Sequence, residues 1–153
     1  MKYSMATVVI LLMGFGGGPA AATCSDNGYT TRLMTTGGDT IADALNGKRI
    51  LATGGGEEWN EDHCANGNLF KVGVSDDDPV DPRAYRGTWG VSGTGANSVV
   101  TYNYTVGGSS SFSWKLWQND AGGLCWENPD NGDIIASTAS TPGALTGTCD
   151  SPP

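Results

Sequence analysis

The most constraining feature of this chain is the alternation of apolar and polar residues between positions 83 and 126. Apolar side chains recur at every second position in three runs, at 88–92, 98–106 and 111–118. This period is that of a β-strand with one buried face. Glycine-rich segments separate the runs, at Gly93-Thr-Gly95 and Gly107-Gly108, and such segments are typical of hairpin turns. The sequence therefore predicts an antiparallel meander.

Further strands extend this meander on both sides. They are expected at 48–52, 68–74, 124–127 and 133–137. The last two flank Asp130-Asn-Gly132, which is a strong turn signal, and the 24 glycines of the chain favour turns over helices. Because the apolar face of the sheet must be covered, we expect a mainly β fold in which about seven strands form a small meander or half-open barrel.

One short N-terminal helix is predicted at 39–45. Asp39 can cap its first turn, Ile41 and Leu45 share an apolar face, and Gly47 follows as a stop signal.

Residues 1–22 have the layout of a secretory signal peptide. Lys2 gives a positive start, 6–15 is an apolar run, and small residues follow at Ala20-Ala-Ala22. The run is too short for a transmembrane span of about 20 residues. A lipid anchor on Cys24 is a weaker alternative, because Thr23 precedes the cysteine where a smaller residue is usual. We therefore expect residues 23–153 to form a single β-rich domain that is secreted or periplasmic.

The four cysteines agree with export. Cys24, Cys64, Cys125 and Cys149 form an even set, which in an oxidising compartment predicts two disulfides. A zinc site is disfavoured because the chain has no Cys-x-x-Cys pair and a single histidine. Of the three possible connectivities we favour Cys64–Cys125 across the sheet and Cys24–Cys149 between the termini.

The charge of the chain limits its partners. The full sequence has a net charge of −8 at pH 7, which disfavours nucleic acids and, after signal cleavage, anionic membranes. A small molecule, a glycan or a basic protein remains a possible partner.

Acidic residues concentrate in two segments. The first contains Glu57, Glu58, Glu61 and Asp62 beside His63, and the second contains Asp76, Asp77, Asp78 and Asp81. Such residues can serve catalysis, a metal site or calcium binding, but a solvated loop is the commoner role of such runs. We expect two polar surface loops, with no catalytic residue, metal or cofactor. Replacing Glu58 and Glu61 by Gln should then change stability by no more than about 0.5 kcal/mol.

Tryptophans beside polar residues provide the candidate binding site. The candidate ligand-binding residues are Trp59, His63, Trp117 and Trp126. Tyr102, Tyr104 and Trp114 lie on the alternating apolar faces and are expected in the core. Trp117 falls on the opposite face, where we expect a helix or loop to cover it.

Several short motifs, taken in order, resemble a family of small exported bacterial proteins of unknown function. They are Leu45-Asn-Gly-Lys48, Trp59-Asn-Glu-Asp-His63, Gly67-Asn-Leu69, Asp78-Pro-Val-Asp-Pro82, Gly87-Thr-Trp89 and Val100-Thr-Tyr-Asn-Tyr104. The resemblance spans roughly 45–136 and implies the fold and export, with no chemistry. Gly87-Thr-Trp89 is also similar to the Gly-x-Trp motif of lipocalins and to a strand of avidins, an analogy of shape.

The sequence thus favours a non-catalytic binding module. Its expected ligand is a small or extended molecule, with carbohydrate as one candidate. The alternative function is a protein inhibitor of a secreted hydrolase, such as a lysozyme or protease, bound through the acidic segments.

Overall fold

The computed structural model describes most of the chain after the predicted signal peptide. It describes residues 22–38, 40–54, 57–72, 82–138, 141–145 and 147–150, with only the backbone at 57 and 59. The elements are η1 (Ser25–Asn27), β1 (Thr31–Arg32), α1 (Ile41–Leu45), β2 (Lys48–Gly54), β3 (Glu57–His63), β4 (Asn68–Val72), β5 (Ala84–Ser92), η2 (Gly95–Asn97), β6 (Val99–Tyr104), β7 (Ser110–Gln118), β8 (Leu124–Glu127), β9 (Ile134–Ser137) and β10 (Gly143–Ala144). Among these residues, no helix has the length and apolar character needed to cross a membrane.

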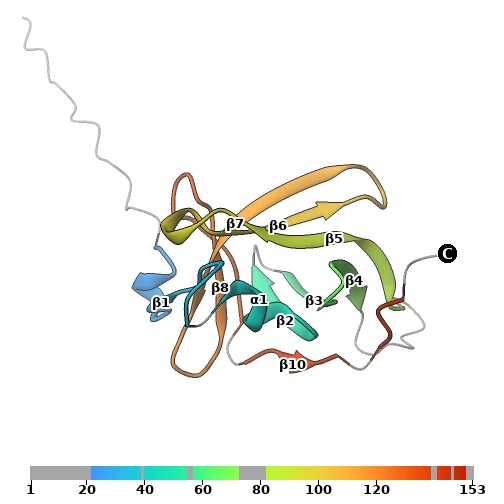
Figure 1. The fold of residues 1–153 in the computed structure, drawn as a ribbon, viewed down its shortest axis with the longest axis horizontal. Helices are drawn as coiled ribbons and strands as arrows, with labels where there is room; N and C mark the ends of the chain where they lie inside the picture. The colour runs from blue at the N-terminus through green and yellow to red at the C-terminus, as the bar shows by residue number, and fades with distance from the viewer. Residues whose placement is uncertain are drawn as a thin grey trace, which may run out of the picture.

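The strands β2 to β9 form a closed antiparallel barrel (Figure 1). Each strand pairs with the next in the chain, and β9 returns to pair with β2 at Thr53 and Ser137. At this seam a Cβ on Gly54 would lie 2.0 Å from the carbonyl oxygen of Ile135, so glycine allows the two backbones to approach. The short strands β1 (Thr31–Arg32) and β10 (Gly143–Ala144) pair antiparallel with β7 and β2, respectively.

The predicted mainly β fold is confirmed, but the barrel is closed instead of half-open. The seven predicted strands are all present, with shifted ends, and β3 is an additional strand within the described residues. It was predicted as a polar loop because it is rich in acids, yet it pairs with both β2 and β4. This eighth strand completes the ring.

The apolar core fills one end of the barrel. On α1, Ile41 and Leu45 are fully buried, and they belong to the same cluster as Leu69 and Trp89. The helix begins at Ile41, two residues after the predicted start at 39. Its cap is Thr40, whose side chain accepts a hydrogen bond from the Asp43 amide, whereas Asp39 lies outside the described residues. Closed by α1, this end of the barrel excludes solvent.

Both disulfides connect the barrel to the segments that flank it. They are Cys24–Cys125 and Cys64–Cys149. The four cysteines are paired as expected, but the favoured connectivity was wrong. Cys125 on β8 bonds the N-terminal segment, and Cys64, just after β3, bonds the C-terminal segment. Periodicity places strands next to one another and does not fix where the two flanking segments cross the outside of the barrel.

Candidate functional site

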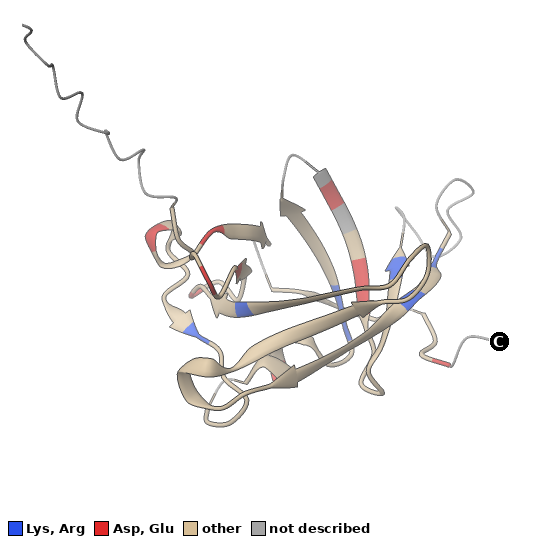
Figure 2. Cartoon of the chain, turned by 90° about the horizontal axis from the view of Figure 1, so that it is seen from above, with Lys and Arg blue, Asp and Glu red and all other residues tan. Residues whose placement is uncertain are grey.

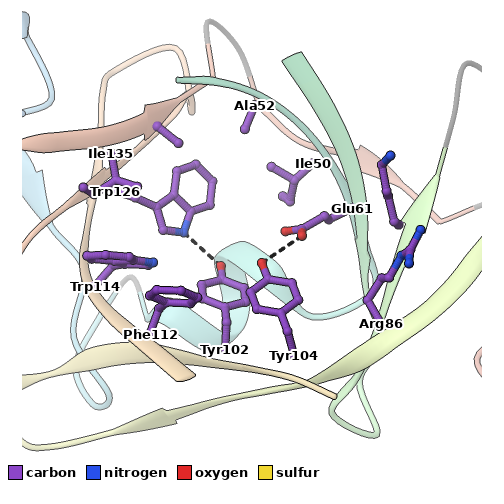
Figure 3. Close-up of a pocket in the computed structure, with 12 residues that line it drawn as sticks. Ile50, Ala52, Glu61, Arg86, Tyr102, Tyr104, Phe112, Trp114, Trp126 and Ile135 are labelled. Carbon is purple, nitrogen blue, oxygen red and sulfur yellow. Dashed lines mark hydrogen bonds between the residues drawn. The ribbon is translucent and has the colours of Figure 1, made fainter. Parts of the chain in front are cut away.

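The barrel contains a cavity at the end opposite α1. Its volume is about 460 Å³, and α1 lies behind it in the view of Figure 3. Side chains from all eight barrel strands line it: Ile50, Ala52, Glu61, Lys71, Arg86, Tyr102, Tyr104, Phe112, Trp114, Trp126, Ile135 and Ala136. Interior positions of small barrels are usually filled by side chains or occupied by one ligand.

Aromatic rings on β6 and β7 form one wall of this cavity. Phe112 and Trp114 stack, with ring centroids 5.8 Å apart and planes 10° apart. Tyr104 meets Phe112 edge to face at 6.2 Å and stacks on Tyr102 at 6.3 Å. The rings follow one another because alternate residues of a strand share a face. Phe112 is 44% exposed, so the wall reaches the solvent.

A buried hydrogen-bonded chain lies beneath the aromatic wall. The Trp126 indole N–H donates to the Tyr102 hydroxyl over 2.9 Å, and that hydroxyl is 3.0 Å from His63 Nε2. Since Tyr102 accepts from Trp126, its own proton is available for a neutral His63. Burial lowers the pKa of His63 to about 4 and raises that of Tyr102 well above its ordinary value. These three hydrogen-bonded side chains are therefore uncharged at neutral pH.

Glu61 is an ionisable group inside the cavity. It points inward from β3, and its Oε1 accepts a hydrogen bond of 2.9 Å from the Tyr104 hydroxyl (Figure 3). Burial raises the pKa of Glu61 to about 7, although the hydrogen bond from Tyr104 acts in the opposite direction. Near neutral pH the carboxyl is thus divided between its protonated and ionised forms.

Two basic side chains, Lys71 and Arg86, line the cavity near Glu61. Lys71 is the cross-strand neighbour of Glu61 in the β3–β4 pair. Figure 3 shows Arg86 on the same side of the cavity as Glu61, across from Trp114. The buried Nε of Arg86 has no hydrogen-bond partner among the described residues. One end of an otherwise apolar cavity therefore has charged groups.

A β-bulge is responsible for the position of Arg86. On β4, Leu69 pairs with Gly87 and the next residue pairs with Tyr85, so Arg86 has no counterpart. Gly87 has φ +153°, and a Cβ there would lie 1.9 Å from the carbonyl oxygen of Asn103. Only glycine fits at this position. Bulges re-aim side chains, and this one directs an arginine into the barrel.

The predicted ligand-binding residues lie in different environments. Trp126 lines the cavity. His63 is fully buried beneath it and contacts Tyr102 and Trp89 edge to face. The side chain of Trp59 lies outside the described residues.

Trp117 lies on the outer face of the barrel. It packs against the cluster formed by Cys24, Tyr29 and Cys125, and the Arg32 guanidinium lies 5.8 Å from its ring centre. The N-terminal segment thus covers it, as expected for a side chain on this face. Trp117 and Trp126 consequently do not share a site.

The first acidic segment is not a solvated loop. Because β3 alternates, Glu61 and His63 face the interior while Asp62 faces outward under cover. Asp62 is fully buried and binds two guanidinium groups, those of Arg49 and Arg83, each with a shortest distance of 2.7 Å. Buried carboxylates require such partners. The second segment, Asp76 to Asp78 with Asp81, lies outside the described residues.

Sequence reasoning missed several residues of the cavity. Tyr104 and Trp114 were expected in a filled core, whereas they are half-buried beside empty space. Arg86 is also absent from the predicted site. Its signal in the sequence is the glycine that follows it, since an isolated glycine in a strand often marks a bulge.

Known proteins provide no independent assignment of this site. Comparison with protein-family models, curated proteins and solved structures finds no significant match for this chain. The resemblance to small exported bacterial proteins of unknown function stays a prediction. Any functional conclusion therefore depends on the geometry of the cavity.

Proposed function

We propose that this protein is an exported, non-catalytic binding protein that holds one small, largely apolar ligand inside its barrel. The observation that carries this proposal is the cavity of about 460 Å³, which is lined by aromatic and aliphatic side chains and opens to solvent. Ligand sites in proteins commonly have volumes of about 300 to 1,000 Å³ and combine an apolar lining with a few polar groups.

The lining favours an apolar ligand over a sugar. Most of the side chains around the cavity are hydrocarbon or aromatic, and the polar ones gather at one end. A sugar would place several hydroxyl groups against surfaces that offer no hydrogen bond, which is unfavourable. An aromatic or alicyclic body would lie flat against Phe112 and Trp114.

Export is supported by the two disulfides. Such bonds are typical of oxidising compartments, and we place the mature protein outside the cytoplasm, secreted or periplasmic. The predicted signal peptide, 1–22, agrees with this location.

The alternative function, inhibition of a hydrolase through acidic loops, has weaker support. Glu61 and Asp62 belong to a strand and do not offer a free acidic loop to a basic enzyme. Figure 2 shows acidic and basic residues on several strands of the described part of the chain.

A cavity-filling substitution tests the proposed function. Ala52 lines the cavity, and its neighbour Leu51 is 48% exposed on the opposite face of β2. Titration with the neutral fluorophore N-phenyl-1-naphthylamine should increase probe emission and quench tryptophan emission. We expect Ala52→Phe to abolish this response and Leu51→Phe to leave it unchanged. A wild-type protein that binds neither this probe nor any member of a panel of apolar compounds and glycans would refute the proposal.

A further inference from the structure

We propose that the ligand is a small aromatic or alicyclic anion, whose apolar body contacts Phe112 and Trp114 and whose acidic group meets Arg86. This inference rests on the function proposed above and specifies its ligand class. A carboxylate, sulfonate or phosphate would serve equally, because a guanidinium recognises all three with parallel N–H···O bonds.

The first argument is the state of Arg86. Its Nε is buried and has no hydrogen-bond partner among the described residues. The other arginines of this protein are partly buried and have partners: Arg83 and Arg49 bind Asp62, and Arg32 donates to the carbonyl oxygens of Leu116 and Ser98. A buried donor without a partner costs free energy, and a bound anion would provide the missing acceptor.

The second argument is that the backbone is built to place this side chain. Arg86 is the unpaired residue of the β5 bulge, and the bulge depends on Gly87, where no other residue fits. The distortion turns a basic residue toward the cavity. Without the bulge, strict alternation would place Arg86 and Gly87 on opposite faces.

The third argument is the balance of charge. The chain has 8 basic and 16 acidic residues, yet among the described residues the charged side chains that line the cavity are two cations, Lys71 and Arg86, and one carboxyl, Glu61. Glu61 is also hydrogen-bonded to Tyr104 and partly protonated near neutral pH. In the described lining, basic side chains therefore outnumber carboxyl groups, although the protein as a whole is acidic.

These features disfavour a cationic ligand. An aromatic wall with a carboxylate can hold an ammonium group by cation–π attraction. Here, however, the same end of the cavity has two basic groups, and Glu61, the one carboxyl in the described lining, already accepts a hydrogen bond.

A matched pair of probes tests the charge of the ligand. N-phenyl-1-naphthylamine and 8-anilino-1-naphthalenesulfonate share one skeleton and differ by a sulfonate. We expect the wild-type protein to bind the sulfonate about tenfold more tightly, the effect of one charge-assisted hydrogen bond. Arg86→Met should remove this preference, measured as the ratio of the two affinities. Arg86→Lys should retain part of it.

Two controls complete the experiment. Lys115→Met removes one positive charge from the outer face, where Lys115 pairs with Glu127, and should not alter either affinity. Ala52→Phe should block both probes and so confirm that they occupy the cavity.

The outcomes separate the two proposals. If neither probe nor any member of the panel binds, the proposed function fails and the anion proposal fails with it. If the amine binds and the sulfonate binds no more tightly, or if Arg86→Met leaves the preference intact, the anion proposal alone is overturned. Tighter binding of an aryltrimethylammonium than of the neutral amine would also overturn it.

Discussion

Glu61→Gln should make the protein less sensitive to alkaline pH. The folded-state pKa of Glu61 is about 7 against an ordinary value of 4.5, and its main cause is burial in the cavity wall. The unfolded chain therefore ionises first as the pH rises. The stability associated with this group is fully present below pH 4.5 and is lost as the pH rises through about 7.

The magnitude follows from the size of the pKa shift. A rise from 4.5 to about 7 corresponds to about 3 kcal/mol, and solvent at the cavity mouth should reduce this to about 2 kcal/mol. Gln keeps an oxygen that can accept the hydrogen bond from Tyr104 and is neutral at every pH. We expect the variant and the wild type to have similar stability at pH 4.5, and the variant to be more stable by about 2 kcal/mol at pH 8.5.

Urea unfolding followed by tryptophan fluorescence at these two pH values measures the difference. The control is Glu58→Gln, which removes an exposed carboxylate from the same strand and should alter stability by less than about 0.5 kcal/mol at both pH values. A stability difference between wild type and Glu61→Gln that does not change with pH would show that burial does not disfavour the charged form. The two substitutions thus have different expected effects on stability, although the sequence alone predicts a small effect for both.

Three further predictions concern the core, the bulge and the disulfides. Burial lowers the pKa of His63 from 6.5 to about 4, so the stability of the wild type should fall as the pH drops through this window. In urea titrations, His63→Gln should lose this pH dependence. An acid response that is the same in the variant and the wild type would contradict the prediction. Gly87→Ala should lower the free energy of unfolding by about 2 to 4 kcal/mol, because its Cβ would lie 1.9 Å from a β6 carbonyl oxygen; Gly90→Ala, with open space around it, is the matched control and should cost less than about 1 kcal/mol. Peptide mapping should link Cys24 to Cys125, and replacing both by Ser should cost about 4 kcal/mol, since the bond closes a loop of 101 residues; a bridge from Cys125 to another cysteine would refute this.

The sequence predicts the strands in which apolar and polar residues alternate, and it misses β3, in which they do not. In β3 the inward positions include Glu61 and His63 instead of aliphatic residues, so a period of two in hydrophobicity is absent. The carboxylate of Asp62 is buried because two arginines from other segments reach it. Such long-range compensation is not visible in a window of neighbouring residues.

The candidate site was predictable only in part. Trp126 lines the cavity, whereas Trp117, which is also followed by polar residues, lies outside it. The alternation that predicts buried aromatics on β6 and β7 does not distinguish a filled interior from a hollow one. That distinction depends on the volumes contributed by all eight strands together.

The closure of the barrel has a consequence for how the chain folds. Among the described barrel strands, seven of the eight pairings join consecutive strands, and β2 with β9 is the remaining one. Consecutive pairings form across short connections at small entropic cost, whereas the seam brings together segments separated by most of the domain. The meander can therefore assemble hairpin by hairpin as an open, curled sheet. The edges of this open sheet, at β2 and β9, are unpaired until the seam forms, and such edges can pair with another molecule. Closure of the ring is therefore the step at which the chain loses this tendency. It is also the step that creates the cavity.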